Sequence, residues 1–265
     1  MQAPRQEVSA KKSLPKPALE LSPEASAFYT DILRILTESK IRFLVAGTFA
    51  VGAYTGISRP TKDIDIFCKP GDYPRILHTF HELGYETAIE DERWLAKVKK
   101  GSLFFDVIFN STASVTPVTD AWFEDVHEAD ILGFTVPVLS PTELIWSKVF
   151  VQNRERYDGA DVVHVMLHEN DNIDWKRLLS YMEAYWEVLL VHLLNFRFIY
   201  PTERHRIPSW LMVELMERLK FQEELPVPET RICRGRMFSK HDYRIDVMEW
   251  GFSDAIGEAG VRDDA

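Results

Sequence analysis

Cysteine is scarce in this sequence: Cys68 and Cys233 are the only two among 265 residues. Two thiols cannot form the disulfide framework of a small secreted domain, and they cannot make a zinc site from cysteine alone. Reduced thiols are typical of the cytosol, so we expect a cytoplasmic protein.

Long apolar runs and an excess of basic charge are also missing. The longest apolar stretch, 188–194, is interrupted by His192, whereas a membrane-spanning helix needs about 20 apolar residues. Residues 1–17 carry basic side chains without the apolar core of a signal peptide. Asp and Glu number 41 against 31 Lys and Arg, for a net charge of -10, and general nucleic-acid binding needs the opposite balance. We expect no membrane contact and at most a local basic groove.

The chain is nevertheless of ordinary globular composition. Hydrophobic residues make up 46% and charged residues 27%, which excludes a disordered or low-complexity protein. Prolines among charges over residues 1–21 predict a mobile N-terminal arm. Ser22, Pro23 and Glu24 then form a helix start, and the apolar spacing predicts a helix to Lys40.

Short alternating elements follow and predict an α/β (α+β) domain over 22–140. We expect a small mixed sheet with flanking helices, built from strands at 43–45, 64–67, 93–98 and 103–109, a strand pair within 131–139, and helices at 48–54 and 72–83. From residue 141 the pattern becomes helical, with helices expected at 141–153, 158–168, 174–200 and 209–222. The sequence therefore predicts a second, helical domain over 141–265, whose tail at 232–252 is rich in arginine and aromatics.

Two carboxylates flank an apolar residue in the second predicted strand. Asp63 and Asp65 lie on either side of Ile64, so both point to one face, with Cβ atoms roughly 7 Å apart. At that distance two unpaired charges repel by about 2 kcal/mol. A divalent cation removes this cost, and oxygen ligands suit Mg²⁺ better than zinc. An Asp-x-Asp pair at a solvated strand end is the simpler reading, so the context decides.

The context is a third acid and a glycine turn. Asp106 interrupts the apolar run 103–109, where a charge is costly unless it is paired or bound to metal. On a neighbouring strand it completes a three-carboxylate cluster, as two-metal phosphoryl chemistry requires. Gly47 precedes a short helix whose N–H groups can hold phosphates. Arg59 and Lys62 add positive charge nearby.

This stretch, 43–67, resembles the nucleotidyltransferase superfamily, with its polymerase-β-like fold, and within it the minimal and antibiotic-modifying branch and the AbiEii-type toxins. The family pattern is a glycine followed by Gly or Ser, a short helix, Asp-x-Asp and a later acid. Gly47 matches the first glycine, Thr48 stands where Gly or Ser is usual, and the acids correspond to Asp63, Asp65 and Asp106. The resemblance implies that these acids hold Mg²⁺ and the nucleoside triphosphate (NTP), and that Asp106 activates the acceptor hydroxyl.

The resemblance continues weakly to about residue 165. It implies that Lys148 reaches the triphosphate and that Asp161 assists the acceptor, with Arg154 and Asp158 nearby and Tyr157 where Lys or Arg is usual. The nucleotide-binding residues are thus expected to be Gly47, Thr48, Arg59, Lys62 and Lys148. The implied reaction moves a nucleoside monophosphate from an NTP to an acceptor hydroxyl and releases pyrophosphate. The acceptor is left open among tRNA, a protein and a small hydroxylated molecule.

Other patterns support rival interpretations. The chain could be a non-catalytic relative that binds a nucleotide or a partner, such as a toxin–antitoxin component. Asp161, His164 and His168 share a helical face, which more often is an ordinary surface than a zinc site. The apolar stripe of 174–200 is typical of a core or of a homodimer contact. Basic residues alternate with aromatics in the tail, which suits either single-stranded nucleic acid or a packed surface.

Overall fold

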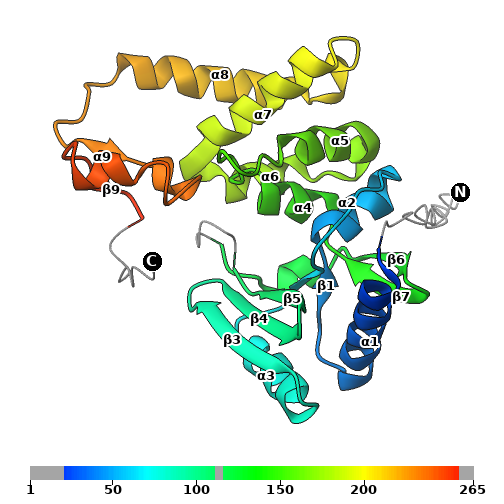
Figure 1. The fold of residues 1–265 in the computed structure, drawn as a ribbon. Coiled ribbons are helices and arrows are strands. Elements are labelled where there is room, and N and C mark those ends of the chain that lie inside the picture. The colour runs from blue at the N-terminus through cyan, green and yellow to red at the C-terminus, as the bar shows by residue number, and fades with distance from the viewer. Residues whose placement is uncertain (1–20, 111–115, 257–265) are drawn as a thin grey trace, which may run out of the picture.

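The fold is built around one mixed β-sheet, with helices packed beside its strands and a further group of helices above it in the view of Figure 1. The computed structural model describes residues 21–110 and 116–256, so the arm expected at 1–21 lies outside the described residues except for Leu21. Within the described part the main sheet has seven strands in the order β3-β4-β5-β2-β1-β7-β6. The expected α+β class with a small mixed sheet and following helices is confirmed.

The centre of the sheet holds four short, largely apolar strands. They are β1 (Leu44–Val45), β2 (Asp65–Phe67), β5 (Leu103–Ile108) and β7 (Phe134–Val138). β1 pairs antiparallel with β2 and parallel with β7, and β2 pairs parallel with β5. These pairings bring segments that are distant in the sequence to neighbouring positions in the sheet.

Antiparallel hairpins form the two edges. One edge is β3 (Glu86–Asp91) paired with β4 (Leu95–Lys100), and the other is β6 (His127–Ile131) paired with β7. The sequence predicts no strand at 86–91. In the structure this segment is an edge strand whose polar side chains are mostly exposed, and its pairing comes from β4. The pair expected within 131–139 begins earlier, because its turn is Leu132–Gly133, both with positive φ, as two-residue hairpin turns favour.

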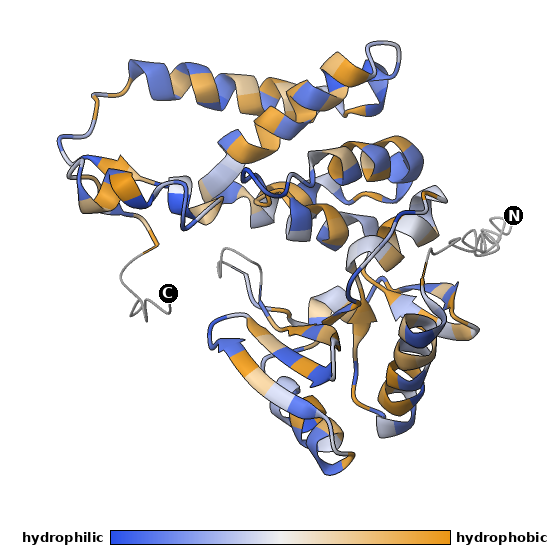
Figure 2. Cartoon of the chain, viewed as in Figure 1, coloured by the Kyte–Doolittle hydropathy of each residue, from blue (hydrophilic) through white to orange (hydrophobic). Residues whose placement is uncertain are grey.

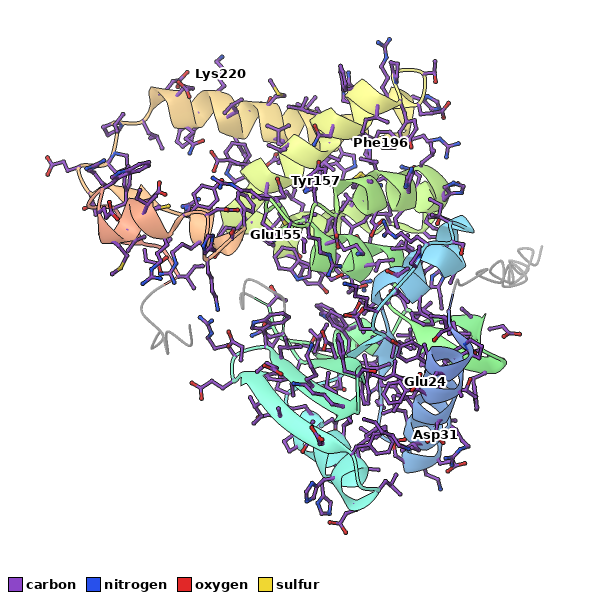
Figure 3. All side chains as sticks on the ribbon, viewed as in Figure 1. Glu24, Asp31, Glu155, Tyr157, Phe196 and Lys220 are labelled. Atoms are coloured by element: carbon purple, nitrogen blue, oxygen red, sulfur yellow. The ribbon has the colours of Figure 1, made fainter. Side chains whose placement is uncertain are left out.

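Two helices cover the sheet, α1 (Pro23–Ser39) and α3 (Tyr73–Glu82). α1 begins as the sequence predicts: the Ser22 side chain accepts a hydrogen bond from the Ala25 N–H, and Pro23 occupies the first turn. Its buried stripe includes Ile32 and Leu36. Glu24 and Asp31 lie along the same helix in Figure 3.

Most of the remaining helices stack beyond α2 (Gly47–Thr55), the helix between β1 and β2 (Figure 1). They are α4 (Pro141–Lys148), α5 (Gly159–Glu169), α6 (Trp175–Tyr181), α7 (Trp186–Ile199) and α8 (Ser209–Glu224). Short 3₁₀-helices cover Asp120–Phe123, Asn170–Asn172, Glu183–Tyr185, Arg204–Arg206 and Gly235–Met237. Hydrophobic and hydrophilic bands alternate along α8 in Figure 2. None of the helices in the described part of the chain combines the length and apolar content needed to cross a bilayer.

Two of the expected helices were too long. The prediction of one helix over 174–200 is wrong, because α6 ends at Tyr181 and a 3₁₀-turn precedes α7. The Met182 N–H donates to both the Leu178 and Leu179 carbonyl groups, which tightens the chain at the break. The helix expected over 141–153 ends at Lys148, because the following residues form a loop closed by an Asp158 N–H bond to the Val151 carbonyl.

The tail folds as a separate small element against the helices. It contains β8 (Ile232–Cys233), α9 (Arg244–Met248) and β9 (Ser253–Asp254), and β8 and β9 pair in parallel. Several of its basic side chains are engaged within the protein, including Arg236 with Asp254 and Lys240 with Asp91. These contacts favour the packed-surface reading of the tail. Cys68 and Cys233 are both buried free thiols.

The expected domain boundary near 140 coincides with the passage from β7 to α4. α2, which precedes that boundary, packs against α4 and α5, which follow it. The division into domains 22–140 and 141–265 therefore stays a prediction, and the site described next is built from both parts.

Candidate active site

Asp65 and Asp106 lie opposite each other on the parallel strands β2 and β5. Asp63 lies just before β2 rather than within it, because the Thr61 hydroxyl donates to the Asp63 carbonyl oxygen at 2.9 Å. One carboxylate oxygen from each of the three acids lies within 4.8 Å of the others. Strand pairing thus brings the distant third acid to the Asp-x-Asp pair, as the sequence predicts.

Gly47 makes room for the Asp65 carboxylate. It is the first residue of α2 and has a φ of +57°, the left-handed region that glycine adopts without strain. A Cβ atom at this position would lie 1.8 Å from Asp65 Oδ2. The glycine is therefore required twice, once by the turn and once by the acid packed against its Cα.

The cluster concentrates negative charge in a partly buried place. Two unit charges at most 4.8 Å apart repel by roughly 3 kcal/mol or more at an effective dielectric constant near 20. Burial raises the pKa of Asp65 above its usual range, and the charges of Asp63 and Asp106 add to this. Burial likewise raises the pKa of Asp106, against the influence of Lys97. Three carboxylates clustered in this way are a donor set that fits a hard divalent cation.

The first turn of α2 adds hydrogen-bond donors beside the acids. The N–H groups of Gly47, Thr48 and Phe49 have no acceptor within the helix, and none donates to another backbone carbonyl among the described residues. The Thr48 side chain is half-buried. A helix N-terminus next to a cation site suits a phosphate group.

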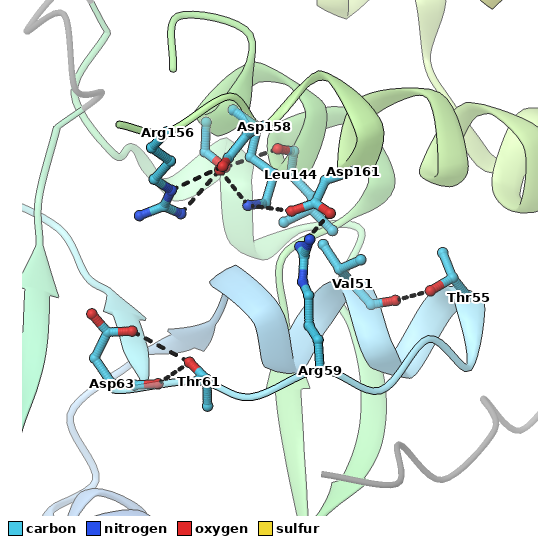
Figure 4. Close-up of polar contacts among 11 residues, drawn as sticks. Val51, Thr55, Arg59, Thr61, Asp63, Leu144, Arg156, Asp158 and Asp161 are labelled. Atoms are coloured by element: carbon cyan, nitrogen blue, oxygen red, sulfur yellow. Dashed lines mark hydrogen bonds and ion pairs between the residues drawn. The ribbon is translucent and has the colours of Figure 1, made fainter. Parts of the chain in front are cut away.

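Arg156 belongs to the connection between α4 and α5 and lies above Asp63 in the view of Figure 4. Its guanidinium is held by Asp158, with Nε 2.8 Å from Oδ1 and Nη2 3.0 Å from Oδ2, while 60% of its side chain stays exposed. These hydrogen bonds raise its pKa, and the charges of Asp65 and Asp63 raise it further. No motif in the sequence marks Arg156 as a site residue. The nearby Arg154 instead contacts Asp242 of the tail at 3.2 Å.

Lys148 and Asp161 lie in a buried ion-pair network behind Arg156. Lys148 Nζ is 2.7 Å from Asp158 Oδ2 and 2.8 Å from Asp161 Oδ2, and only 4% and 2% of the Lys148 and Asp161 side chains are exposed. The other oxygen of Asp161 accepts a hydrogen bond from Arg59 (Figure 4). The network ties the loop that leads into Asp63 to α4 and α5. The cations Arg59, Lys148 and Arg156 outnumber the carboxylates Asp158 and Asp161. The network therefore carries one net positive charge.

Lys62 and Tyr157, which the sequence analysis also names, are not part of this ion-pair network. The Lys62 side chain is exposed and forms no ion pair with any other described residue. Tyr157 lies beside α7 in Figure 3, where its hydroxyl accepts a hydrogen bond from Asn195 Nδ2 at 3.1 Å. A Cβ atom on Gly159 would meet the Tyr157 ring at 2.1 Å. Tyr157 therefore joins the start of α5 to α7.

Among the described residues, the three acids form the single group of His, Cys, Asp and Glu side chains able to hold a metal ion. His164 and His168, on α5, belong to no such group. The ordinary reading of that helix face is thereby favoured over a zinc site.

A family model described as a nucleotidyl transferase of unknown function (DUF2204) matches residues 25–194. No protein of curated function matches the sequence.

Solved structures with a similar fold include the lincomycin-bound lincosamide antibiotic adenylyltransferase LnuA, at 15% identity and a TM-score of 0.39, covering 55% of this chain and 96% of that one. The antibiotic-resistance factor ANT(2'')-Ia matches at 16% identity and a TM-score of 0.44, covering 70% and 97%. An antigenic nucleotidyltransferase-like protein from Paracoccidioides brasiliensis matches at 15% identity and 0.44, covering 70% and 93%.

Proposed function

Because the chain belongs to the nucleotidyl transferase family DUF2204, we propose that it transfers a nucleoside monophosphate from an NTP to an acceptor hydroxyl in a Mg²⁺-dependent reaction. The observation that carries the proposal is the meeting of Asp63, Asp65 and Asp106 beside the Gly47 turn. In the reaction the acceptor oxygen forms a bond to the α-phosphorus, the bond from this phosphorus to the β-phosphate oxygen breaks, and pyrophosphate leaves.

The three acids would hold the divalent ions and, through them, the triphosphate. When bound, Mg²⁺ neutralises phosphate charge and lowers the pKa of the acceptor hydroxyl. Asp106 is the acid that takes up the acceptor proton on its carboxylate in this proposal. The role of the protein is otherwise to position the reactants and to stabilise charge.

The phosphates would be bound by donors on both sides of the acids. The N–H groups of Gly47 and Thr48 lie at the start of α2, and Arg156 lies on the helical side with part of its guanidinium still exposed. Arg59 and Lys62 belong to the loop that leads into Asp63. Lys148 is buried against Asp158 and Asp161, which supports a role through positioning of Arg156 and Arg59.

The proposal includes a cytoplasmic location, consistent with two unpaired thiols. It also retains the homodimer expected through 174–200. Val191, Leu194 and Phe198 form an exposed apolar row on α7, which supports such a contact. Light scattering on the purified protein measures the mass, and a monomer at all concentrations would remove the dimer from the proposal.

The test is a labelling experiment with each α-labelled NTP, Mg²⁺ and a whole-cell extract, in which label is followed into RNA, protein and small molecules. We expect one fraction to take up label from one NTP, and the fraction identifies the acceptor class. The Asp63→Asn variant is the control for contaminating activity. Tight Mg²⁺-dependent NTP binding without any transfer would instead support the non-catalytic alternative.

A further inference from the structure

A lysine stands in line with two of the three acids. Lys97 on β4 is the register partner of Asp106 on β5, which in turn is the register partner of Asp65 on β2. Residues opposite each other on neighbouring strands project to the same face of a sheet. Ala96 and Val98, on either side of Lys97, are fully buried on the other face.

The Lys97 ammonium is held in place from two directions. Its Nζ lies 2.9 Å from Asp106 Oδ1 and 3.9 Å from the centroid of the Phe104 ring. Phe104 precedes Asp106 by two residues on β5 and so shares its face. Only 19% of the Lys97 side chain and 15% of the Asp106 side chain are exposed. A clamped, mostly buried pair of this kind fixes the carboxylate orientation better than an exposed pair does.

The neighbouring lysines do not share this arrangement. Lys99 Nζ is 3.0 Å from Glu90 Oε1, and Lys100 Nζ lies 4.9 Å from the centroid of the Tyr85 ring. Three lysines that lie close together in the sequence therefore make three different contacts. Of the three, Lys97 is the one paired with an acid of the candidate site.

We propose that Lys97 is a positioning residue that occupies Asp106 Oδ1 and leaves Oδ2 as the oxygen presented to the acid cluster, where it would serve both a divalent ion and the acceptor proton. The inference rests on the proposed function, because it assumes that the three acids hold the ion. Lys97 also offsets one of the three negative charges while the ion is absent. It thereby lowers the affinity for the ion and, in exchange, keeps Asp106 in one orientation.

Two opposite effects follow from removing the charge at position 97. A neutral side chain no longer repels the divalent ion, so Lys97→Met tightens Mg²⁺ or Mn²⁺ binding by several-fold. The same change leaves Asp106 free to rotate or to bind through both oxygens, and loss of an outer-shell partner typically lowers activity by about 10- to 100-fold. An ion pair with a merely structural role would lower the stability and move neither quantity in these directions.

The experiment compares the wild type, Lys97→Met, Lys97→Arg and Lys99→Met as full-length proteins. Isothermal titration calorimetry measures the dissociation constant for Mn²⁺ without substrate, and nucleotide transfer gives kcat. We expect tighter Mn²⁺ binding with lower kcat in Lys97→Met, values near the wild type in Lys97→Arg, and no change in Lys99→Met. Lys97→Gln replaces Lys97→Met if the latter does not fold.

Failure of the inference differs from failure of the proposed function. A wild-type protein that binds no divalent ion contradicts the proposed function itself. A wild-type protein that binds the ion, together with a Lys97→Met variant whose Mn²⁺ affinity is unchanged or weaker, overturns the role of Lys97. An unchanged kcat in Lys97→Met overturns it as well.

Discussion

Asp65 and Asp106 face each other in register across the parallel strands β2 and β5, although β3 and β4 separate them in the chain. Each is the polar residue of an otherwise apolar strand. Asp65 lies against Gly47 at the start of α2, and its charge acts on Arg156. Asp106 shares the face of Asp65 because the two residues are in register. The position of the site is therefore a direct consequence of strand pairing. Single substitutions of the acids can test their roles.

Asp63→Asn and Asp106→Asn each remove one oxygen donor from the cluster. We expect nucleotide transfer to fall by more than about 100-fold in both, because even the loss of an outer-shell partner costs about 10- to 100-fold. Circular dichroism should show an unchanged fold, since both side chains are only partly buried and asparagine has nearly the same size and shape as aspartate. Asp171→Asn, which changes an exposed acid on a short 3₁₀-helix, serves as the control. Transfer near the wild-type rate in Asp63→Asn would refute the assignment.

Gly47→Ala tests the packing of Asp65 against the α2 turn. A left-handed backbone costs a non-glycine residue about 1–2 kcal/mol, and the overlap with Asp65 Oδ2 adds about 1–3 kcal/mol. Gly56→Ala is a matched control, because Gly56 also has positive φ but nothing lies within 4 Å of its Cβ position. Urea denaturation should show a larger loss in Gly47→Ala, and equal losses would contradict the packing argument.

Lys148→Met leaves Asp158 and Asp161 as buried acids with fewer cations. Breaking a buried ion pair on one side typically costs about 3–5 kcal/mol, so we expect a loss of that order in the free energy of unfolding. The double variant Lys148→Met, Asp161→Asn should recover part of this loss. Lys176→Met, at an exposed position of α6, is the control. A stable Lys148→Met protein with a raised KM for NTP would instead indicate direct contact with the triphosphate.

His192 predicts a dependence of stability on pH. It is fully buried on α7 with its Nε2 atom 3.0 Å from the Val149 carbonyl oxygen, and burial lowers its pKa. Below about pH 6.5 the unfolded chain binds a proton that the folded protein does not. The free energy of unfolding should therefore fall as the pH drops, by up to about 1.4 kcal/mol per pH unit, until the folded group also protonates.

The measurement is urea denaturation of the wild type, His192→Gln and His78→Gln across this range. His192→Gln should flatten the acid side of the profile, whereas His78→Gln, which alters an exposed residue, should leave it unchanged. Identical slopes in all three proteins would show that His192 does not contribute.

The sequence was sufficient to place the three acids and Gly47 because their signals are local. A charge in an apolar strand and a glycine before a short helix are each visible without the fold. The edge strand β3 was not visible, because its polar, exposed residues lack the alternation that marks a half-buried strand. The break between α6 and α7 was missed for another reason: no proline or glycine marks it, and the apolar residues continue across it.

Arg156 and Lys97 show what pattern alone does not supply. Arg156 lies in a loop without periodicity, and its relation to Asp63 and Asp65 arises only when α4 and α5 pack beside the sheet. Lys97 was visible as one of several basic residues, but its pairing with Asp106 depends on the register between β4 and β5. Both side chains become informative through contacts between segments that are distant in sequence.

The close approach of Gly47 to Asp65 also constrains how such a chain can diverge. Any side chain at position 47 overlaps the carboxylate of residue 65 as long as that residue is aspartate. A change at position 47 is therefore expected only together with a change at position 65. At Gly56, where the surrounding space is open, the only demand is backbone conformation, which asparagine also meets. Homologous chains that retain the acid should accordingly vary at position 56 while remaining fixed at position 47.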